Sequence, residues 1–292
     1  MPFTIAESFT KLRSNLEITF PQGETVSTRQ QTVRRVLASN FTIVDDFLTG
    51  SYARWTMISP LSEADIDIFI CLDPSYYNAF NGANGGPAGL LGRVRVALRQ
   101  TYTSTPDISR NGQAVTIRFS DFVVDVVVGF NRQGGGYIIA NAVNNFWLST
   151  DPKQHVLLMS AANKYHNGNL VPLIKMIKSW NKSHGSFFRS FHLEVLALNI
   201  FTNVTITDFQ SGLRFFFEKA RTAVRNPTLD PANYGDNVGR YITSATMEQG
   251  VQKLQGAFNS AVHAENYGKR GDHKAAIAIW KHLMPYHFPA YG

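Results

Sequence analysis

The fold is decided by two nearby stretches, Thr49-Gly50-Ser51-Tyr52-Ala53-Arg54 and Asp65-Ile66-Asp67-Ile68-Phe69-Ile70. Alternate residues of a strand point to the same face, so Asp65 and Asp67 are predicted to project side by side from an apolar strand. Neighbouring carboxylates repel each other unless a cation lies between them, and hard oxygen ligands suit Mg²⁺. The Gly50-Ser51 turn can offer backbone N–H groups and a hydroxyl to a phosphate. Together the two stretches predict a nucleoside-triphosphate site in which metal and phosphate are held against one sheet.

A third carboxylate interrupts the β-branched run Val123-Val124-Asp125-Val126-Val127-Val128. An unpaired carboxylate in a buried strand is costly, so Asp125 needs a partner there. Placed beside the Asp65/Asp67 strand, it would complete a site for two Mg²⁺ ions, for which Mn²⁺ could substitute. We therefore predict that Asp65, Asp67 and Asp125 are both the catalytic residues and the metal ligands. The competing interpretation is a surface strand with an ordinary turn.

The order of Gly-Ser turn, Asp-x-Asp and distant Asp resembles the nucleotidyltransferase superfamily that includes DNA polymerase beta. The resemblance implies an α+β fold, with a polymerase-beta-like nucleotidyltransferase core around a mixed β-sheet and a C-terminal helical lobe. The corresponding domains are residues 1–150, the core with two N-terminal helices, and residues 151–292, a helical lobe closing the nucleotide cleft.

Composition agrees with a globular protein, because 44% of the 292 residues are hydrophobic and 12% are aromatic. No apolar run approaches the roughly 20 residues of a membrane span, and the N-terminus shows no signal-peptide pattern. The single cysteine, Cys71, excludes an internal disulfide and favours a reducing, cytoplasmic location.

The net charge of +7 is concentrated in one segment. Ten Lys/Arg residues and three acidic residues lie between Lys153 and Arg225, and the remainder of the chain is balanced. A basic second half suits triphosphate binding. Nucleic acid is not expected as a required partner, because runs of basic residues and Arg/aromatic repeats are lacking.

Periodicity predicts the secondary structure in outline. Helices are expected from about Ile5 to Asn40, from Pro87 to Tyr102, and over most of the chain after Asp151. Strands are expected at Ile43–Leu48, Asp65–Leu72, Val115–Phe119, Phe122–Gly129 and, at an edge, Tyr137–Ala140.

The helix after Gly168 places Lys175, Lys178 and Lys182 close together, opposite an apolar face. Taken alone, this lysine stripe favours a solvated face, which is its usual role.

The sequence from Leu173 to Asn181, followed by Arg189-Ser190-Phe191-His192-Leu193-Glu194, resembles the helical lobe of cyclic GMP–AMP synthase-like enzymes. The whole chain is similar to the bacterial CD-NTases, the second-messenger synthases of anti-phage CBASS systems. The resemblance implies that Gly50 and Ser51 approach the phosphates, that Lys178 and Ser190 contact the donor triphosphate, and that Phe191 stacks on a base. Lys164 is a weaker candidate for phosphate contact.

The resemblance also implies the reaction. ATP and other NTPs would be joined into a cyclic di- or trinucleotide with release of pyrophosphate, and the product would activate a separate effector; a regulatory protein partner is possible in this family. Alternatives are a template-independent polynucleotide or tRNA nucleotidyltransferase and a catalytically silent nucleotide-binding protein. Phe191 could instead be a core residue, and we expect His192 to be a hydrogen-bonded structural histidine.

Overall fold

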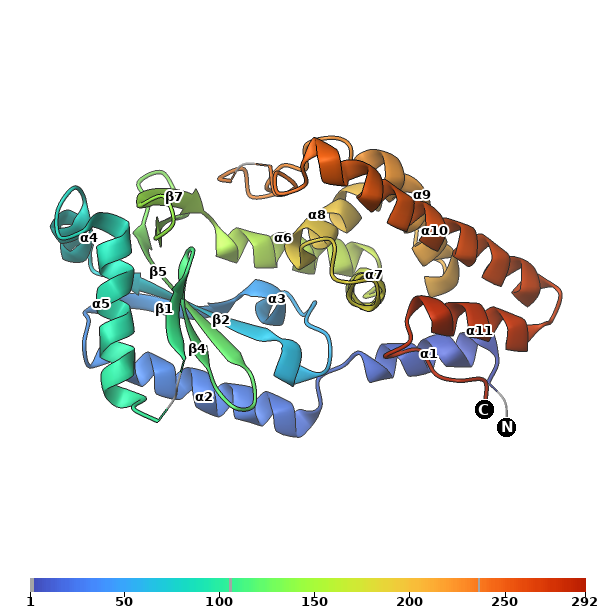
Figure 1. Cartoon of the computed structure of the whole chain (residues 1–292), viewed down its shortest axis with the longest axis horizontal. Coiled ribbons are helices and arrows are strands. Elements are labelled where there is room, and N and C mark those ends of the chain that lie inside the picture. Colours follow the sequence, from blue (N-terminus) through green and yellow to red (C-terminus); the bar gives the residue numbers. More distant parts are fainter. Residues whose placement is uncertain (1–2, 105–106, 236) are drawn as a thin grey trace. The chain divides into compact units, whose positions relative to one another are not determined.

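The computed structural model describes residues 3–104, 107–235 and 237–292. The chain divides into two compact units, which are treated separately below (Figure 1). The sheet unit is Ile18–Leu157, and the helical unit is Met1–Glu17 together with Leu158–Gly292. The α+β prediction, with a mixed sheet and a helical C-terminal region, is confirmed.

The sheet unit is built on one seven-stranded sheet. Its strands are β1 (Ile43–Thr49), β2 (Asp65–Leu72), β3 (Ile108–Asn111), β4 (Ala114–Arg118), β5 (Val123–Asn131), β6 (Tyr137–Asn141) and β7 (Phe146–Thr150). The order is β1-β2-β5-β4-β3, with β6 pairing both β5 and β7. Among the described strands, β2 and β5 pair in parallel and the other pairs are antiparallel. The expected strand at Tyr137–Ala140 is therefore an inner strand and not an edge, because Phe146–Thr150 adds a strand outside it.

Helices cover one face of this sheet. The helices of the unit are α2 (Phe20–Ala38), α3 (Gly50–Ala53), α4 (Pro74–Phe80) and α5 (Gly86–Thr101), with a 3-10 turn at Leu61–Glu63. Apolar residues of α2 and α5 pack on the even-numbered residues of β2 and β5, such as Ile68 and Val126, in the main core. A smaller cluster around Phe69, Cys71 and Tyr137 occupies part of the opposite face. Asp65 and Asp67 belong to that opposite face, because they alternate with the core residues of β2.

The helical unit contains α1 (Ile5–Asn15), α7 (Leu170–Ser183), α8 (Ser190–Ile200), α9 (Phe209–Ala223), α10 (Ser244–Lys269) and α11 (His273–Leu283). Helix α6 (Pro152–Tyr165) crosses the boundary between the units. The first helix differs from the expected grouping, since α1 packs with α7 and α11 of the helical unit. The ring of Phe9 meets the ring of Trp280 edge-on at 5.2 Å, and this aromatic contact helps to hold α1 against α11. No helix among the described residues is long and apolar enough to span a membrane.

Candidate active site

The central feature of the site is a row of polar residues running across four strands. The strand register places Asp67 opposite Thr49 of β1 and Asp125 of β5, and Asp125 opposite Thr116 of β4. Residues opposite each other in neighbouring strands project from the same face. The predicted alignment of Asp67 with Asp125 on one face is therefore present in the sheet. Asp65 lies on the same face, two residues earlier in β2.

The surroundings of Asp65 and Asp125 raise the pKa of both carboxyl groups. Partial burial and repulsion from Asp125 raise the pKa of Asp65, while the Arg118 guanidinium acts in the opposite direction. Burial also raises the pKa of Asp125, against the effects of a hydrogen bond from Thr116 and of Arg118. Thr116 Oγ1 donates that bond to Asp125 Oδ1 at 2.5 Å. A cation at this face would relieve both the burial cost and the repulsion.

Gly50 meets this row at the end of β1. Its φ of +65° lies in the left-handed region. A Cβ atom added at Gly50 would stand 1.7 Å from Asp67 Oδ2, so the turn and the carboxylate lie in direct contact. The backbone N–H groups of Thr56 and Met57 donate to the Ser51 carbonyl at 2.9 and 3.1 Å and hold the turn closed. The Ser51 hydroxyl has no hydrogen-bond partner within the described residues, which leaves it available to a ligand.

The donor set fits a hard divalent cation. Carboxylate oxygens on one face, with the pKa of Asp65 raised by burial and by repulsion from Asp125, are chemically suited to Mg²⁺ or Mn²⁺. Across residues 3–104, 107–235 and 237–292, however, no three His, Cys, Asp or Glu side chains are already grouped closely enough to hold a metal. Asp65, Asp67 and Asp125 therefore supply suitable ligands without forming a closed coordination shell.

In the helical unit, Ser190 occupies the first turn of α8. The preceding residue, Arg189, has extended backbone and gives no side-chain cap to the helix. The Ser190 side chain is exposed, and no described residue bonds its hydroxyl. An uncapped helix N-terminus with a free hydroxyl favours anions. Lys164, in the last turn of α6, is likewise exposed and has no ion pair among the described residues.

Lys178 has a different environment. Only 6% of its side chain is exposed, and its Nζ atom lies 3.2 Å from Oε1 of Glu194, which is fully buried. Lys175 is also buried and contacts Glu17 at 2.7 Å. The solvated-face interpretation of the lysine stripe is therefore wrong for Lys175 and Lys178, since each lysine is buried and paired with a carboxylate that the helix periodicity alone could not identify.

His192 fixes the first turn of α8 to a loop before α10. Its Nδ1 lies 2.9 Å from the Tyr241 hydroxyl and its Nε2 lies 3.1 Å from Thr228 Oγ1. The same Tyr241 hydroxyl accepts the backbone N–H of Arg189 at 2.8 Å. Burial lowers the pKa of His192 to about 4, so its ring is neutral at pH 7. The histidine has the structural, hydrogen-bonded environment that was expected, while its neighbour Phe191 is half-buried.

The structure thus brings together Gly50, Ser51 and the three carboxylates in the sheet unit. Lys164, Lys178, Ser190 and Phe191 all lie in the helical unit. Sequence reasoning missed Thr116, although Phe119 and Phe122 close a tight hairpin that sets Thr116 opposite Asp125. Counting residues back along β4 from that hairpin would have identified Thr116 as the residue opposite Asp125. Glu194 carried no comparable signal, because its partner lies on another helix.

Comparison with known families shows which family the chain belongs to. The model of the Second Messenger Oligonucleotide or Dinucleotide Synthetase domain matches residues 3–163, which include the Gly-Ser turn and the three carboxylates. The chain belongs to this family. It is therefore a nucleotidyltransferase of the cyclic oligonucleotide synthase class, and the resemblance to bacterial CD-NTases is confirmed.

Two relatives match most of the length of this chain. A probable cyclic nucleotide synthase of Bacillus cereus (strain VD146), IK1_05630, is 28% identical over 83% of this chain and 81% of its own length. The cyclic AMP-AMP-AMP synthase of an Acinetobacter species is 26% identical over 98% of this chain and 86% of its own length. Escherichia coli MS115-1 CdnC, in its HORMA-deltaN complex, superposes with a TM-score of 0.70 at 14% identity and covers 98% of both chains. At that identity the structural match supports the fold alone.

Proposed function

We propose that this synthase joins ATP, alone or with a second NTP, into a cyclic di- or trinucleotide that serves as a second messenger in anti-phage defence. The single observation that carries the proposal is the alignment of Asp67 with Asp125 beside the Gly50 turn. The 26% identical relative, named as a cyclic AMP-AMP-AMP synthase, favours a ring of three adenylates.

The chemistry is nucleotidyl transfer. A ribose hydroxyl oxygen of the acceptor attacks the α-phosphorus of the donor NTP, the bond to the β-phosphate oxygen breaks, and pyrophosphate leaves. We assign Asp125 to help remove the hydroxyl proton. Repetition, followed by attack within the same molecule, closes the ring with one pyrophosphate released for each nucleotide.

We assign Asp65, Asp67 and Asp125 to hold two Mg²⁺ ions. When bound, the ions neutralise the triphosphate charge and lower the pKa of the attacking hydroxyl. Gly50 has no side chain, so the backbone of the turn can approach the phosphates. A side chain at this position would also displace the Asp67 carboxylate. The free Ser51 hydroxyl can then donate to a phosphate oxygen.

The helical unit would supply further phosphate and base contacts. Ser190 is the best supported of these, since both its hydroxyl and the uncapped N-terminus of α8 are available. Exposed Lys164 can add a charge, and half-buried Phe191 can stack on a base. A phosphate contact by Lys178 would have to compete with its ion pair to Glu194.

The test is product analysis. Purified protein is incubated with Mg²⁺ and with ATP, with each other NTP, and with all four together, and the products are treated with phosphatase and resolved by mass spectrometry. We expect a phosphatase-resistant ring from ATP and one pyrophosphate per nucleotide. Linear, phosphatase-sensitive chains would indicate polynucleotide synthesis instead. Absence of product, from protein that binds ATP, would support the silent nucleotide-binding alternative.

The biological role needs a separate measurement. We expect phage plaque formation on the native host to rise when the chromosomal chain carries Asp67→Asn. Equal plaque counts on the wild-type and Asp67→Asn strains, with a wild-type enzyme that forms product in vitro, would argue against the defence role and leave the enzymatic proposal intact. A regulatory protein partner, as in the structure of CdnC with HORMA-deltaN, is a further proposal.

A further inference from the structure

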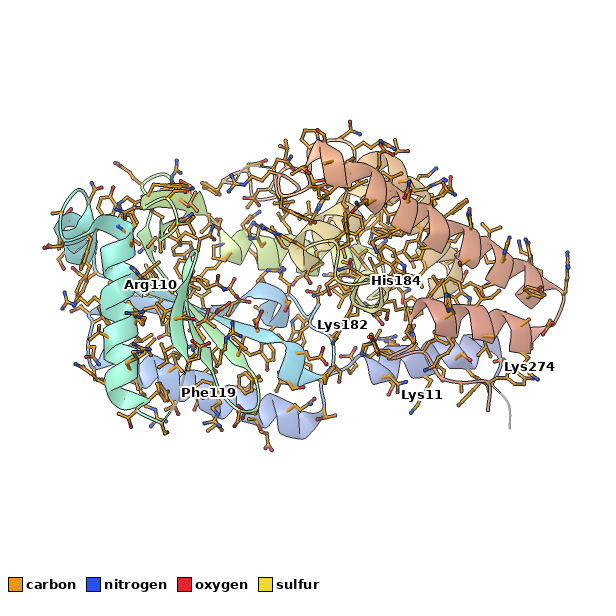
Figure 2. The ribbon with its side chains drawn as sticks, in the orientation of Figure 1. Lys11, Arg110, Phe119, Lys182, His184 and Lys274 are labelled. Atoms are coloured by element: carbon orange, nitrogen blue, oxygen red, sulfur yellow. The ribbon has the colours of Figure 1, made fainter. Side chains whose placement is uncertain are left out.

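The loop that leads into α8 is anchored close to Ser190. Helix α7 ends at Ser183, and its C-cap residue His184, labelled in Figure 2, begins this loop. The side-chain amide of Asn181 on α7 holds the backbone of Phe188. It donates to the Phe188 carbonyl at 2.8 Å and accepts the Phe188 N–H at 3.0 Å. The chain is therefore fixed two residues before Ser190.

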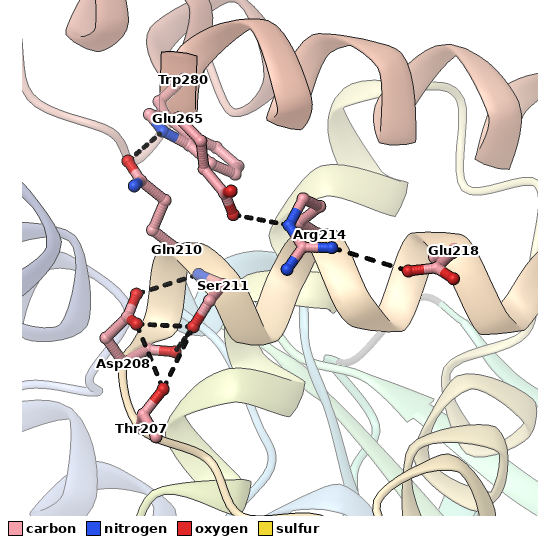
Figure 3. Close-up of polar contacts among 8 residues, drawn as sticks. All are labelled: Thr207, Asp208, Gln210, Ser211, Arg214, Glu218, Glu265 and Trp280. Atoms are coloured by element: carbon pink, nitrogen blue, oxygen red, sulfur yellow. Dashed lines mark hydrogen bonds and ion pairs between the residues drawn. The ribbon is translucent and has the colours of Figure 1, made fainter. Parts of the chain in front are cut away.

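The N-terminus of α8 is held differently from that of α9. Asp208 caps α9, since its carboxylate accepts the Ser211 backbone N–H at 2.9 Å (Figure 3). The cap residue of α8, Arg189, gives no such side-chain bond to its helix. Instead, the Tyr241 hydroxyl accepts the Arg189 backbone N–H at 2.8 Å, and the Tyr241 ring lies under the Arg189 guanidinium at 4.6 Å. The start of α8 is thus held from outside the helix.

The same hydroxyl reaches the other side of Ser190. It lies 2.9 Å from Nδ1 of the buried His192, whose Nε2 lies 3.1 Å from Thr228 Oγ1. With the ring neutral, the Tyr241 hydroxyl can donate to Nδ1 while its oxygen accepts from Arg189. Tyr241 therefore joins the residue before Ser190 to the residue two positions after it.

The segment between α9 and α10 is braced where it meets α8. Asn237 Oδ1 accepts the backbone N–H groups of Thr228 and Gly239, each at 2.9 Å. A Cβ atom added at Gly239 would stand 2.9 Å from Cε1 of His192, so this segment packs closely against the ring. The Tyr241 hydroxyl is therefore presented to α8 by a segment with internal hydrogen bonds of its own.

We propose, on the basis of the Ser190 phosphate contact in the proposed function, that Tyr241 is a positioning residue that sets the Ser190 hydroxyl for the triphosphate. Tyr241 holds Arg189 and His192, which flank Ser190 and Phe191, so the exposed Ser190 side chain starts from a fixed first turn. A binding group that is fixed in advance loses less conformational entropy when its ligand binds.

Steady-state kinetics of Tyr241→Phe test this, because the change removes the hydroxyl and keeps the ring under Arg189. We expect the KM for ATP to rise about fivefold and kcat to stay within about twofold of wild type, since the lost interaction serves substrate and transition state alike. Tyr76→Phe is the matched control and should keep the wild-type KM. The Tyr76 hydroxyl also accepts a backbone N–H, from Thr42 at 3.3 Å, and Arg93 lies over its ring at 5.3 Å.

A double variant shows whether Tyr241 acts through Ser190. Ser190→Ala alone should raise the KM about tenfold. Adding Tyr241→Phe should then raise it less than about twofold further, because the positioned hydroxyl is already absent.

The outcomes separate this inference from the proposed function. Effects that multiply in the double variant would mean that Tyr241 acts independently of Ser190, and would overturn the positioning role. A wild-type KM in Tyr241→Phe beside a raised KM in Ser190→Ala would also overturn that role and leave the proposed function intact. A wild-type KM in Ser190→Ala would overturn the Ser190 contact itself, and the positioning role with it.

Discussion

The carboxylates on the acidic face of the sheet and the lysines of the buried helix α7 differ in whether an opposite charge lies beside them. On the sheet, burial and repulsion from the Asp125 carboxylate both raise the pKa of Asp65. On α7, each buried lysine has its own carboxylate, Glu194 for Lys178 and Glu17 for Lys175. A buried charge that is paired with an opposite charge has its electrostatic partner within the fold, whereas neighbouring like charges are stabilised when a ligand of opposite charge binds. The sheet face is therefore the stronger candidate for chemistry.

The catalytic role of the sheet face is tested most directly by removing one of its carboxylates. Asp67→Asn should lower product formation at least ~1,000-fold, because a metal ligand and its charge are lost. The melting temperature should stay the same or rise, since repulsion among the carboxylates falls. Product formation and thermal unfolding measure the two effects. Asp107→Asn, which removes an exposed partner of Arg118, is the control and should change the rate only a few-fold. Near-normal activity in Asp67→Asn would refute the site.

Removing one member of the α7 pair should have the next largest effect, and on stability. Lys178→Ala removes the ammonium group that lies 3.2 Å from the fully buried Glu194 carboxylate, so the free energy of unfolding should fall by about 3–5 kcal/mol. Lys175→Ala should cost less, because its partner Glu17 is half-exposed and can be hydrated. Urea unfolding of both variants provides the comparison.

A double variant separates pairing from nucleotide binding. Lys178→Met with Glu194→Leu should recover most of the lost stability, since apolar residues of similar size replace the pair. If the recovered protein also has a normal KM for ATP, Lys178 does not contact the triphosphate. A KM raised tenfold or more would instead support the predicted phosphate contact.

The sequence predicted the sheet face more fully than the helical unit, for a physical reason. Strand alternation and the short β4–β5 hairpin are local, so the faces of Asp65, Asp67 and Asp125 follow from residue numbers. The pairing of Lys178 with Glu194 depends on how two helices pack, which periodicity does not contain. The position of α1 could not be predicted for the same reason, because its Phe9 packs on Trp280, which is distant in the sequence.

Gly50→Ala tests whether the turn and the carboxylate act together. Alanine at a φ of +65° costs roughly 1–2 kcal/mol, and its Cβ would displace the Asp67 carboxylate. We expect a rate loss of about 100-fold, or about 2.7 kcal/mol in transition-state stabilisation. Gly112→Ala is a matched control, because Gly112 has a φ of +60° and no atom within 4 Å of its added Cβ. It should lose similar stability and keep full activity; equal rate losses would mean that backbone strain alone is responsible.

The smallest expected effect concerns His192, a buried group that is neutral and satisfied. Its pKa in the folded protein is about 4, below the ordinary value of 6.5, so the unfolded chain binds more protons between these values. The stability that His192 contributes is complete above pH 6.5 and is lost as the pH falls toward 4. Between pH 7 and pH 5 this loss amounts to about 2 kcal/mol.

Urea unfolding at the two pH values measures the His192 effect by difference. His192→Gln cannot titrate, so its free energy of unfolding should fall about 2 kcal/mol less than that of the wild type over this range. His263→Gln, at an exposed histidine of α10, should retain the wild-type pH dependence. Protonation would also require both the Tyr241 and the Thr228 hydroxyl to accept, because a charged ring has two donors and no acceptor. Hydroxyl groups can rotate to do so, so the main cost of protonation is the burial of the charge. An unchanged pH dependence in His192→Gln would show that the ring is hydrated, and that the loop carrying Tyr241 does not seal the first turn of α8.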